Sequence, residues 1–265
     1  MQKPMKLNTK KNTLKISLSN NELTLGSWIT LGHPAIAEIM SGCGYDWLTV
    51  DLEHSVITIK EAEELIRIIN LSDVTPLVRL TSNDENQIKR VMDAGSHGVI
   101  VPMVKSAQDA QNAINAVKYP PRGTRGVGLA RAQGYGKSFE SYMKWLEEES
   151  IVIVQIEHID AVNNLEEIFS VKDVDGYIVG PYDLSASMNI PGNFSHPDFL
   201  AAMDKIKSVA QNLNMSGGIH IIEPDSNQLE ERIKEGYSFI AYSLDIRMLE
   251  NNAKSGIEFL KESVK

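Results

Sequence analysis

The sequence predicts a single α/β domain built as a (β/α)8 barrel. Eight short, apolar, β-prone segments recur along the 265 residues, and a segment long enough for a helix follows each of them. This alternation is typical of a parallel sheet covered by helices, and eight such units in one domain favour a closed barrel. A doubly wound open sheet is the alternative, but the first strand–helix turn contains no GxGxxG phosphate-binding sequence.

Residues 1–20 differ from the rest of the chain because they are polar and rich in Lys and Asn. We expect a loose polar arm there and the barrel over residues 21–265. The predicted strands are 25–30, 47–50, 76–80, 98–101, 151–156, 176–179, 218–222 and 239–243. The predicted helices are 34–41, 58–70, 84–94, 106–117, 163–169, 197–213, 226–234 and 245–260.

Local signals support several of these bounds. Pro34 suits the first turn of a helix, and Thr58 with Glu61 is the pattern of a capping box. The helix that begins at Thr58 carries a stripe of apolar residues at helical spacing, which predicts that one face packs on a core. Gly95 ends the helix before the fourth strand, and Pro102 closes that strand.

The composition excludes several classes of protein. Lys plus Arg is 26 and Asp plus Glu is 35, so the net charge is −9, which disfavours a nucleic-acid surface. No apolar run approaches the ~20 residues that span a membrane. The single Cys43 excludes an intrachain disulfide and a multi-cysteine metal site. The N-terminus lacks the apolar core of a signal peptide, so a cytoplasmic protein is the default expectation.

The stretch Tyr45–His54 (YDWLTVDLEH) combines a buried strand with ionisable residues at its end. Active sites of (β/α)8 barrels lie at the C-terminal ends of the strands. Asp51 and His54 are therefore candidates for an acid–base pair in which the carboxylate orients the imidazole. The alternative is a strand end with solvated charges.

Charged residues follow other strands at the same end. Arg79 lies within PLVRL, where apolar neighbours imply burial, and a buried guanidinium needs an acidic partner or an anionic ligand. Glu157 and Asp183 follow adjacent strands, and two carboxylates without cysteine favour a hard cation such as Mg²⁺ or Mn²⁺. Exposed carboxylates and a structural ion pair of Arg79 are the alternatives.

The segment 120–136 is long and rich in glycine for a plain connection. Its RGVG sequence contains Gly126, Val127 and Gly128, whose backbone N–H groups are candidates to bind an anionic substrate. A mobile solvent loop is the alternative reading.

Taken together, these motifs resemble the HpcH/HpaI aldolase family of pyruvate-dependent class II aldolases. The likeness extends from about residue 23 to 255, with the motifs in order. It is carried by GSW at 26–28, DWLTVDLEHS at 46–55, PLVRL at 76–80, IKRVMDAGSHGVIVPMV at 88–104, YPPRGTRGVG at 119–128, QIE at 155–157 and GPYDLSASM at 180–188.

The resemblance implies a barrel, a divalent metal (Mg²⁺, Mn²⁺ or Co²⁺) and a homo-hexamer arranged as a dimer of trimers, in which the last helix packs on a neighbour. It also implies residue roles. Glu157 and Asp183 would bind the metal, Arg79 would bind the pyruvate oxygens, and His54 with Asp51 would transfer protons. The remaining residues expected to contact substrate are Gln155, Gly126, Val127, Gly128, Pro181 and Tyr182.

The sequence departs from the family pattern at several positions. Leu52 replaces the usual Gly of the D-G-E-H motif, and Tyr182 stands where a small residue is usual. The segments 217–225 and 242–245 also differ from the best-known members, which affects the expected aldehyde specificity.

The expected activity is reversible retro-aldol cleavage of a 4-hydroxy-2-oxo acid to pyruvate and an aldehyde. No lysine stands at a strand end where it could form a Schiff base, since Lys89 and Lys105 belong to helices or their starts. Two alternatives stay open. One is a citrate-lyase-β or malyl-thioester lyase, although no coenzyme A signature is visible, and the other is a barrel that binds a keto acid without catalysis.

Overall fold

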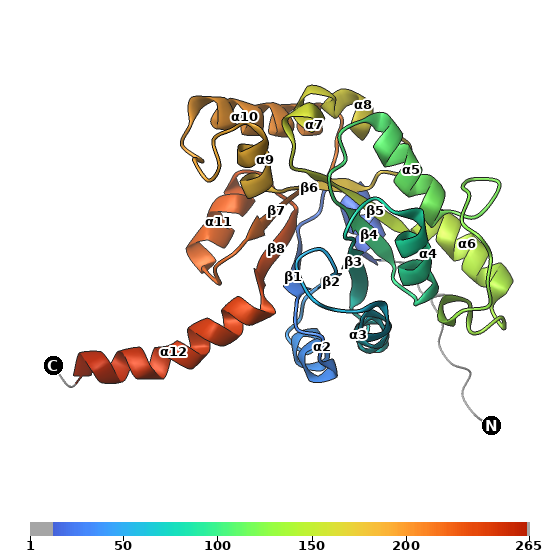
Figure 1. Ribbon diagram of the computed structural model, residues 1–265, viewed down its shortest axis with the longest axis horizontal. Helices are drawn as coiled ribbons and strands as arrows, with labels where there is room; N and C mark the ends of the chain where they lie inside the picture. The colour runs from blue at the N-terminus through green and yellow to red at the C-terminus, as the bar shows by residue number, and fades with distance from the viewer. Residues whose placement is uncertain (1–12, 264–265) are drawn as a thin grey trace.

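The computed structural model describes residues 13–263 and confirms the predicted barrel (Figure 1). Eight parallel strands follow one another around a closed sheet in chain order. The strands are β1 (Thr24–Ile29), β2 (Trp47–Asp51), β3 (Thr75–Arg79), β4 (Gly98–Val101), β5 (Ile151–Ile156), β6 (Gly176–Val179), β7 (Gly217–Ile221) and β8 (Phe239–Leu244). Each predicted strand therefore exists, with bounds that differ by one residue at most.

The helices surround the barrel, and seven of the eight predicted ones are single helices close to their expected bounds. The predicted helix 163–169 is instead two short helices, α7 and α8. The described helices are α1 (Thr13–Ser19), α2 (Pro34–Ser41), α3 (Ile59–Leu71), α4 (Glu85–Asp93), α5 (Ala107–Val117), η1 (Arg131–Gln133), α6 (Phe139–Glu149), α7 (Ile159–Asn163), α8 (Leu165–Phe169), α9 (Pro181–Ser187), α10 (Pro197–Asn212), α11 (Ser226–Lys234) and α12 (Asp245–Ser263). The predicted capping box is present, because Thr58 Oγ1 accepts from Glu61 N and Glu61 accepts from Thr58 N.

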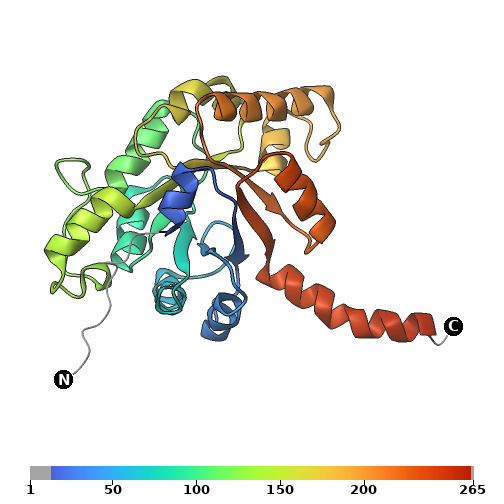
Figure 2. The ribbon, with the colours of Figure 1, turned by 180° about the vertical axis from the view of Figure 1, so that it is seen from behind.

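Helix α1 closes the N-terminal end of the barrel. Leu14 and Leu18 are each 2% exposed and pack with inward-facing residues of the strands, among them Trp47 and Phe239. Figure 2 shows α1 lying across the centre of the ring of strands. The expected loose arm over residues 1–20 is therefore a packed helix from Thr13 to Ser19, and residues 1–12 lie outside the described part. The apolar pair at i and i+4 gives the helix a buried face despite its polar composition.

Side chains alternate between two cores. Ile151 and Ile153 belong to the cluster inside the barrel, whereas Val152 and Val154 pack under the helices. The alternation fixes which residues reach the interior at the C-terminal end of the barrel, including Asp51 and its register partner Arg79.

Helix α12 projects away from the barrel (Figures 1 and 2). Apolar side chains along it are exposed: Ile246, Leu249, Ile257, Phe259 and Leu260. Among residues 13–263, no helix is both long enough and apolar enough to cross a membrane.

Candidate active site

The centre of the site is a buried ion pair between neighbouring strands. Arg79 on β3 donates from Nε to Asp51 Oδ1 at 2.9 Å and from Nη2 to Asp51 Oδ2 at 2.6 Å. Asp51 is 1% exposed at the end of β2. Although burial disfavours the charged guanidinium, the hydrogen bonds and charges of Asp51 and Glu53 raise the pKa of Arg79 above its usual value. The arginine is therefore a fixed positive charge at the rim.

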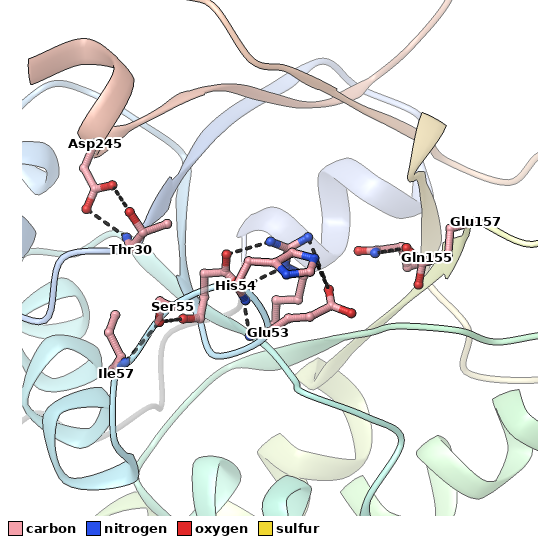
Figure 3. A network of polar contacts seen from close by, with 10 residues as sticks. Thr30, Glu53, His54, Ser55, Ile57, Gln155, Glu157 and Asp245 are labelled. Atoms are coloured by element: carbon pink, nitrogen blue, oxygen red, sulfur yellow. Dashed lines mark hydrogen bonds and ion pairs between the residues drawn. The ribbon is translucent and has the colours of Figure 1, made fainter. Parts of the chain in front are cut away.

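Two more groups hold the Arg79 guanidinium in place, and Figure 3 shows one of them, Glu53, among the polar contacts of the site. Glu53 Oε2 lies 3.3 Å from Nη1, on the edge that Asp51 leaves open. The Trp28 ring, from β1, lies 4.4 Å from the guanidinium carbon, which is a cation–π contact. A guanidinium held by two carboxylates and an aromatic face has little freedom to rotate, so it is preorganised to meet an anion.

The structure does not form the predicted pair between Asp51 and the His54 imidazole. Asp51 Oδ1 accepts from the backbone N–H groups of Glu53 at 3.0 Å and His54 at 3.3 Å, and both of its oxygens bind Arg79. The His54 side chain is 63% exposed, and its Nε2 lies 3.8 Å from Glu53 Oε2. The buried guanidinium is the stronger partner for Asp51, which leaves the imidazole at the solvent edge beside Glu53.

Glu157 follows β5 and is 2% exposed. Its Oε1 accepts from Met103 N at 2.7 Å, and its Oε2 accepts a hydrogen bond from the Gln155 side chain. Gly180 leaves room for it, because a Cβ at that position would lie 2.8 Å from Glu157 Oε2. Burial raises the pKa of Glu157 to about 6, and the charges of Glu53 and Asp183 add to this effect.

Asp183 lies in the first turn of α9, directly after β6, and its side chain is exposed. The pKa values of both Glu53 and Glu157 are raised in part by its charge. Since β5 and β6 are paired through Ile156 and Val179, Glu157 and Asp183 leave adjacent strands at the same end of the barrel.

The residues fit a divalent cation by their charge. The charges of Asp51, Glu53 and Glu157 act on the Arg79 guanidinium, and the charge of Asp183 acts on Glu53 and Glu157. A bound divalent cation would reduce this excess of negative charge. Among residues 13–263, no group of three or more His, Cys, Asp or Glu side chains is placed to hold a metal ion, so the predicted pair Glu157 and Asp183 stays the candidate.

Of the predicted substrate contacts, Gln155 lies at the rim but Gly126, Val127 and Gly128 do not. Helix α5 returns the chain to the N-terminal ends of the strands, and Arg131 anchors the following segment there by donating to Ala94 O at 3.0 Å. Gly126 to Gly128 are exposed at that end. A single chain therefore does not bring these residues to the rim.

Pro181 and Tyr182 begin α9 beside Asp183. The Tyr182 side chain is 57% exposed and contacts the Phe194 ring edge-on, with ring centroids 4.9 Å apart. Both residues lie at the rim, so their expected contact with substrate stays a prediction.

Sequence reasoning missed two residues of the site. Glu53 was visible as a third ionisable residue after β2, but its contact with Arg79 depends on side-chain geometry. Trp28 lies within the GSW motif of a predicted strand, where an aromatic residue is typical of the hydrophobic core. No sequence signal distinguishes this ring from a core aromatic, although arginines commonly stack on aromatic faces.

Comparison with known proteins gives a consistent result. The sequence model of the HpcH/HpaI aldolase/citrate lyase family matches residues 24–252. A hydroxypyruvate/pyruvate aldolase of Roseobacter denitrificans is 36% identical over 247 residues, which cover 92% of this chain and 95% of that protein. A 4-hydroxy-2-oxo-heptane-1,7-dioate aldolase of Escherichia coli is 35% identical over 247 residues, covering 92% and 93%.

A solved structure shares the whole fold. It is a member of the same family from Burkholderia cenocepacia, with a TM-score of 0.89 and 29% sequence identity. The match covers 95% of this chain and 100% of that one.

Proposed function

Since the chain belongs to the HpcH/HpaI aldolase/citrate lyase family, we propose that it is a metal-dependent class II pyruvate aldolase. The aldolases among its relatives are carbon–carbon lyases, and so is this enzyme. The proposed reaction is the reversible cleavage of a 4-hydroxy-2-oxo acid to pyruvate and an aldehyde.

The observation that carries the proposal is the buried Arg79 guanidinium, fixed by Asp51 and facing a cluster of carboxylates. Cleavage of the bond between C3 and C4 leaves the electron pair on the pyruvate half as an enolate. A preorganised positive charge in a partly dry site stabilises this developing negative charge more than it stabilises the neutral ketone. Arg79 would bind the keto-acid oxygens and stabilise the enolate, while Asp51 keeps its orientation.

Glu157 and Asp183 would hold the divalent cation, with Mg²⁺, Mn²⁺ and Co²⁺ as candidates. Such a cation supplies Lewis-acid polarisation of the keto group. Gln155 and the Met103 N–H orient the Glu157 carboxylate, so its position does not depend on the cation alone.

His54 would transfer protons at the solvent edge. Its imidazole is exposed, so a water molecule can connect it to the 4-hydroxyl group, whose proton must leave when the bond breaks. Glu53 Oε2 lies 3.8 Å from Nε2.

We also propose that the enzyme is a homo-hexamer, a dimer of trimers. Helix α12 supports this, because its exposed apolar side chains, such as Leu249 and Phe259, form a surface that another copy would cover. Sedimentation of the full chain and of a chain ending before Asp245 tests the oligomer.

The activity is tested by pyruvate release from 4-hydroxy-2-oxo-heptane-1,7-dioate, coupled to lactate dehydrogenase, with each of the three cations. The proposal expects turnover that depends on the cation. Pyruvate binding without turnover of any 4-hydroxy-2-oxo acid would instead indicate a keto-acid-binding barrel and would overturn the proposal.

A further inference from the structure

Four polar atoms of inward-facing strand residues have no hydrogen-bond partner among the described residues. One is Trp47 Nε1, on a ring that stacks on Phe239, and the other three are Trp28 Nε1 on β1, Thr49 Oγ1 on β2 and His220 Nε2 on β7. Thr49 and His220 each lie between two residues that pack under the helices, and Trp28 belongs to the cluster inside the barrel. Because side chains alternate along a strand, all three face inward. Trp28 is 2% exposed and Thr49 is fully buried. Buried polar atoms without partners cost free energy unless a ligand or a water molecule satisfies them.

These three residues adjoin the candidate active site. Trp28 and Thr49 are register partners on β1 and β2, and the Trp28 ring lies 5.6 Å from the His220 ring. The Trp28 ring also contacts the Arg79 guanidinium, whose carbon lies 4.4 Å from the ring centroid. Thr49 faces the same way as Asp51, two residues further along the strand. The unpartnered atoms therefore lie beside the group proposed to bind the keto acid.

The Ser243 backbone lies beside the His220 ring and raises its pKa, against the larger opposite effect of burial, while Nε2 has no hydrogen-bond partner. A neutral imidazole has one N–H donor and one acceptor nitrogen, so a ring that donates from Nδ1 toward Ser243 presents a lone pair at Nε2. Burial lowers the pKa of His220 to about 4, which keeps the ring neutral at pH 7. Nε2 is then a hydrogen-bond acceptor and too weak a base to remove a proton from carbon.

The Ser243 carbonyl is itself held in an unusual position. Ser243 has φ +54, and the pairing of β1 with β8 shifts register between Gly26 and Trp28. Ser27 Oγ also donates to the Ser243 carbonyl, at 3.1 Å. A bulge in β8 thus places the Ser243 backbone beside His220, and such bulges commonly lie next to active sites.

We propose that Trp28, Thr49 and His220 form a hydroxyl-binding subsite for donor keto acids that carry a hydroxyl group on C3, such as hydroxypyruvate. The inference rests on the proposed function. Trp28 donates, His220 accepts and Thr49 does either, which together match a hydroxyl group. The subsite adjoins the buried Arg79 rather than the exposed His54, so it faces the keto acid and not the incoming aldehyde.

The test is deuterium exchange at C3, followed by NMR in D2O with Mg²⁺, because exchange reports enolate formation without any aldehyde. Pyruvate and hydroxypyruvate are compared in the wild-type chain and in three variants. His220→Leu removes the acceptor, His220→Gln keeps one, and Thr49→Val removes a hydroxyl at constant shape. We expect the ratio of kcat/KM for hydroxypyruvate over pyruvate to fall about tenfold in His220→Leu and to stay within about threefold in His220→Gln.

The outcomes separate this inference from the proposed function. In one outcome pyruvate exchanges, but neither His220→Leu nor Thr49→Val changes the ratio of kcat/KM for hydroxypyruvate over pyruvate. Ordered water alone would then occupy the subsite, which would overturn the inference while the aldolase assignment stands. No exchange of either acid by the wild-type chain would overturn both. If His220→Leu does not fold, an about threefold or larger fall of the ratio in Thr49→Val supports the subsite, and an unchanged ratio refutes it.

Discussion

Replacement of Asp51 by Asn tests how Arg79 is held. In this variant the amide oxygen can still accept from Arg79 Nε, now 2.9 Å from Oδ1. The amide nitrogen would replace Oδ2, which accepts from Nη2 at 2.6 Å, so two donors would face each other. One charge-assisted hydrogen bond is lost, worth about 1.5–3 kcal/mol, and the other loses its ionic character.

The lost hydrogen bond sets the expected loss of stability. Glu53 stays 3.3 Å from Nη1 and offsets part of the loss, so we expect the variant to be about 2–3 kcal/mol less stable. If the guanidinium also leaves its position, about the same energy is lost from the transition state, which corresponds to a fall of kcat/KM by about 10²-fold.

Urea denaturation followed by circular dichroism measures the stability, and pyruvate release measures kcat/KM. Asp46→Asn is the matched control, because exposed Asp46 accepts from Leu25 N, at 2.8 Å, at the opposite end of β2 from Asp51. We expect the control to lose about 1 kcal/mol or less and to keep its activity. An Asp51→Asn variant with the stability and kcat/KM of the wild type would refute the assigned role of the pair.

Three further predictions concern Arg79 itself, helix α1 and His97. Arg79→Lys should lower kcat/KM by about 10²-fold, because an ammonium group cannot make the two hydrogen bonds that the guanidinium makes to Asp51. The control Arg131→Lys, at the other end of the barrel, should keep the wild-type value. Equal rates of pyruvate release by the two variants would contradict the prediction. Leu14→Ala should lower the free energy of unfolding by about 2–5 kcal/mol, because Leu14 is buried. The control Ile16→Ala, at an exposed position of the same helix, should lower it by about 1 kcal/mol or less. Equal midpoints of urea unfolding for the two variants would show that α1 does not close the barrel. Burial lowers the pKa of His97 to about 3, so the stability from its neutral ring is full above pH 6.5 and is lost as the pH falls toward 3. Between pH 6.5 and 4.5 this loss amounts to about 2 kcal/mol, and His97→Gln should remove it from the pH dependence of unfolding. An identical pH dependence in both chains would contradict the prediction.

Much of the fold follows from local patterns in the sequence. The eight strands were predictable because apolar β-prone segments such as Ile151–Ile156 are bounded by clear turn and helix signals. The capping box at Thr58 and Glu61 formed as expected, since both of its hydrogen bonds are local. Helix α1 was missed because its polar composition hides two leucines one turn apart, whose burial depends on the open end of a barrel formed by distant strands.

The sequence predicted which residues form the candidate site better than it predicted their contacts with one another. Strand ends place Asp51, Arg79 and Glu157 at one rim, and this follows from the topology alone. Which partner Asp51 binds depends on side-chain rotamers and on the competition between a guanidinium and an imidazole, which no spacing encodes. The position of the RGVG segment within one chain was not predictable, because a glycine-rich composition suits any turn, while the direction of α5 decides at which end of the barrel the segment lies.

The central claim is that Glu157 and Asp183 share a divalent cation on which enolate formation depends. The direct measurement is a Mn²⁺ titration by electron paramagnetic resonance of the chelator-treated chain and of Glu157→Gln and Asp183→Asn, with pyruvate release assayed on the same samples. We predict one tight site in the wild type, its loss in each variant, and a parallel loss of activity. Either variant binding Mn²⁺ like the wild type and releasing pyruvate at the wild-type rate would contradict the claim.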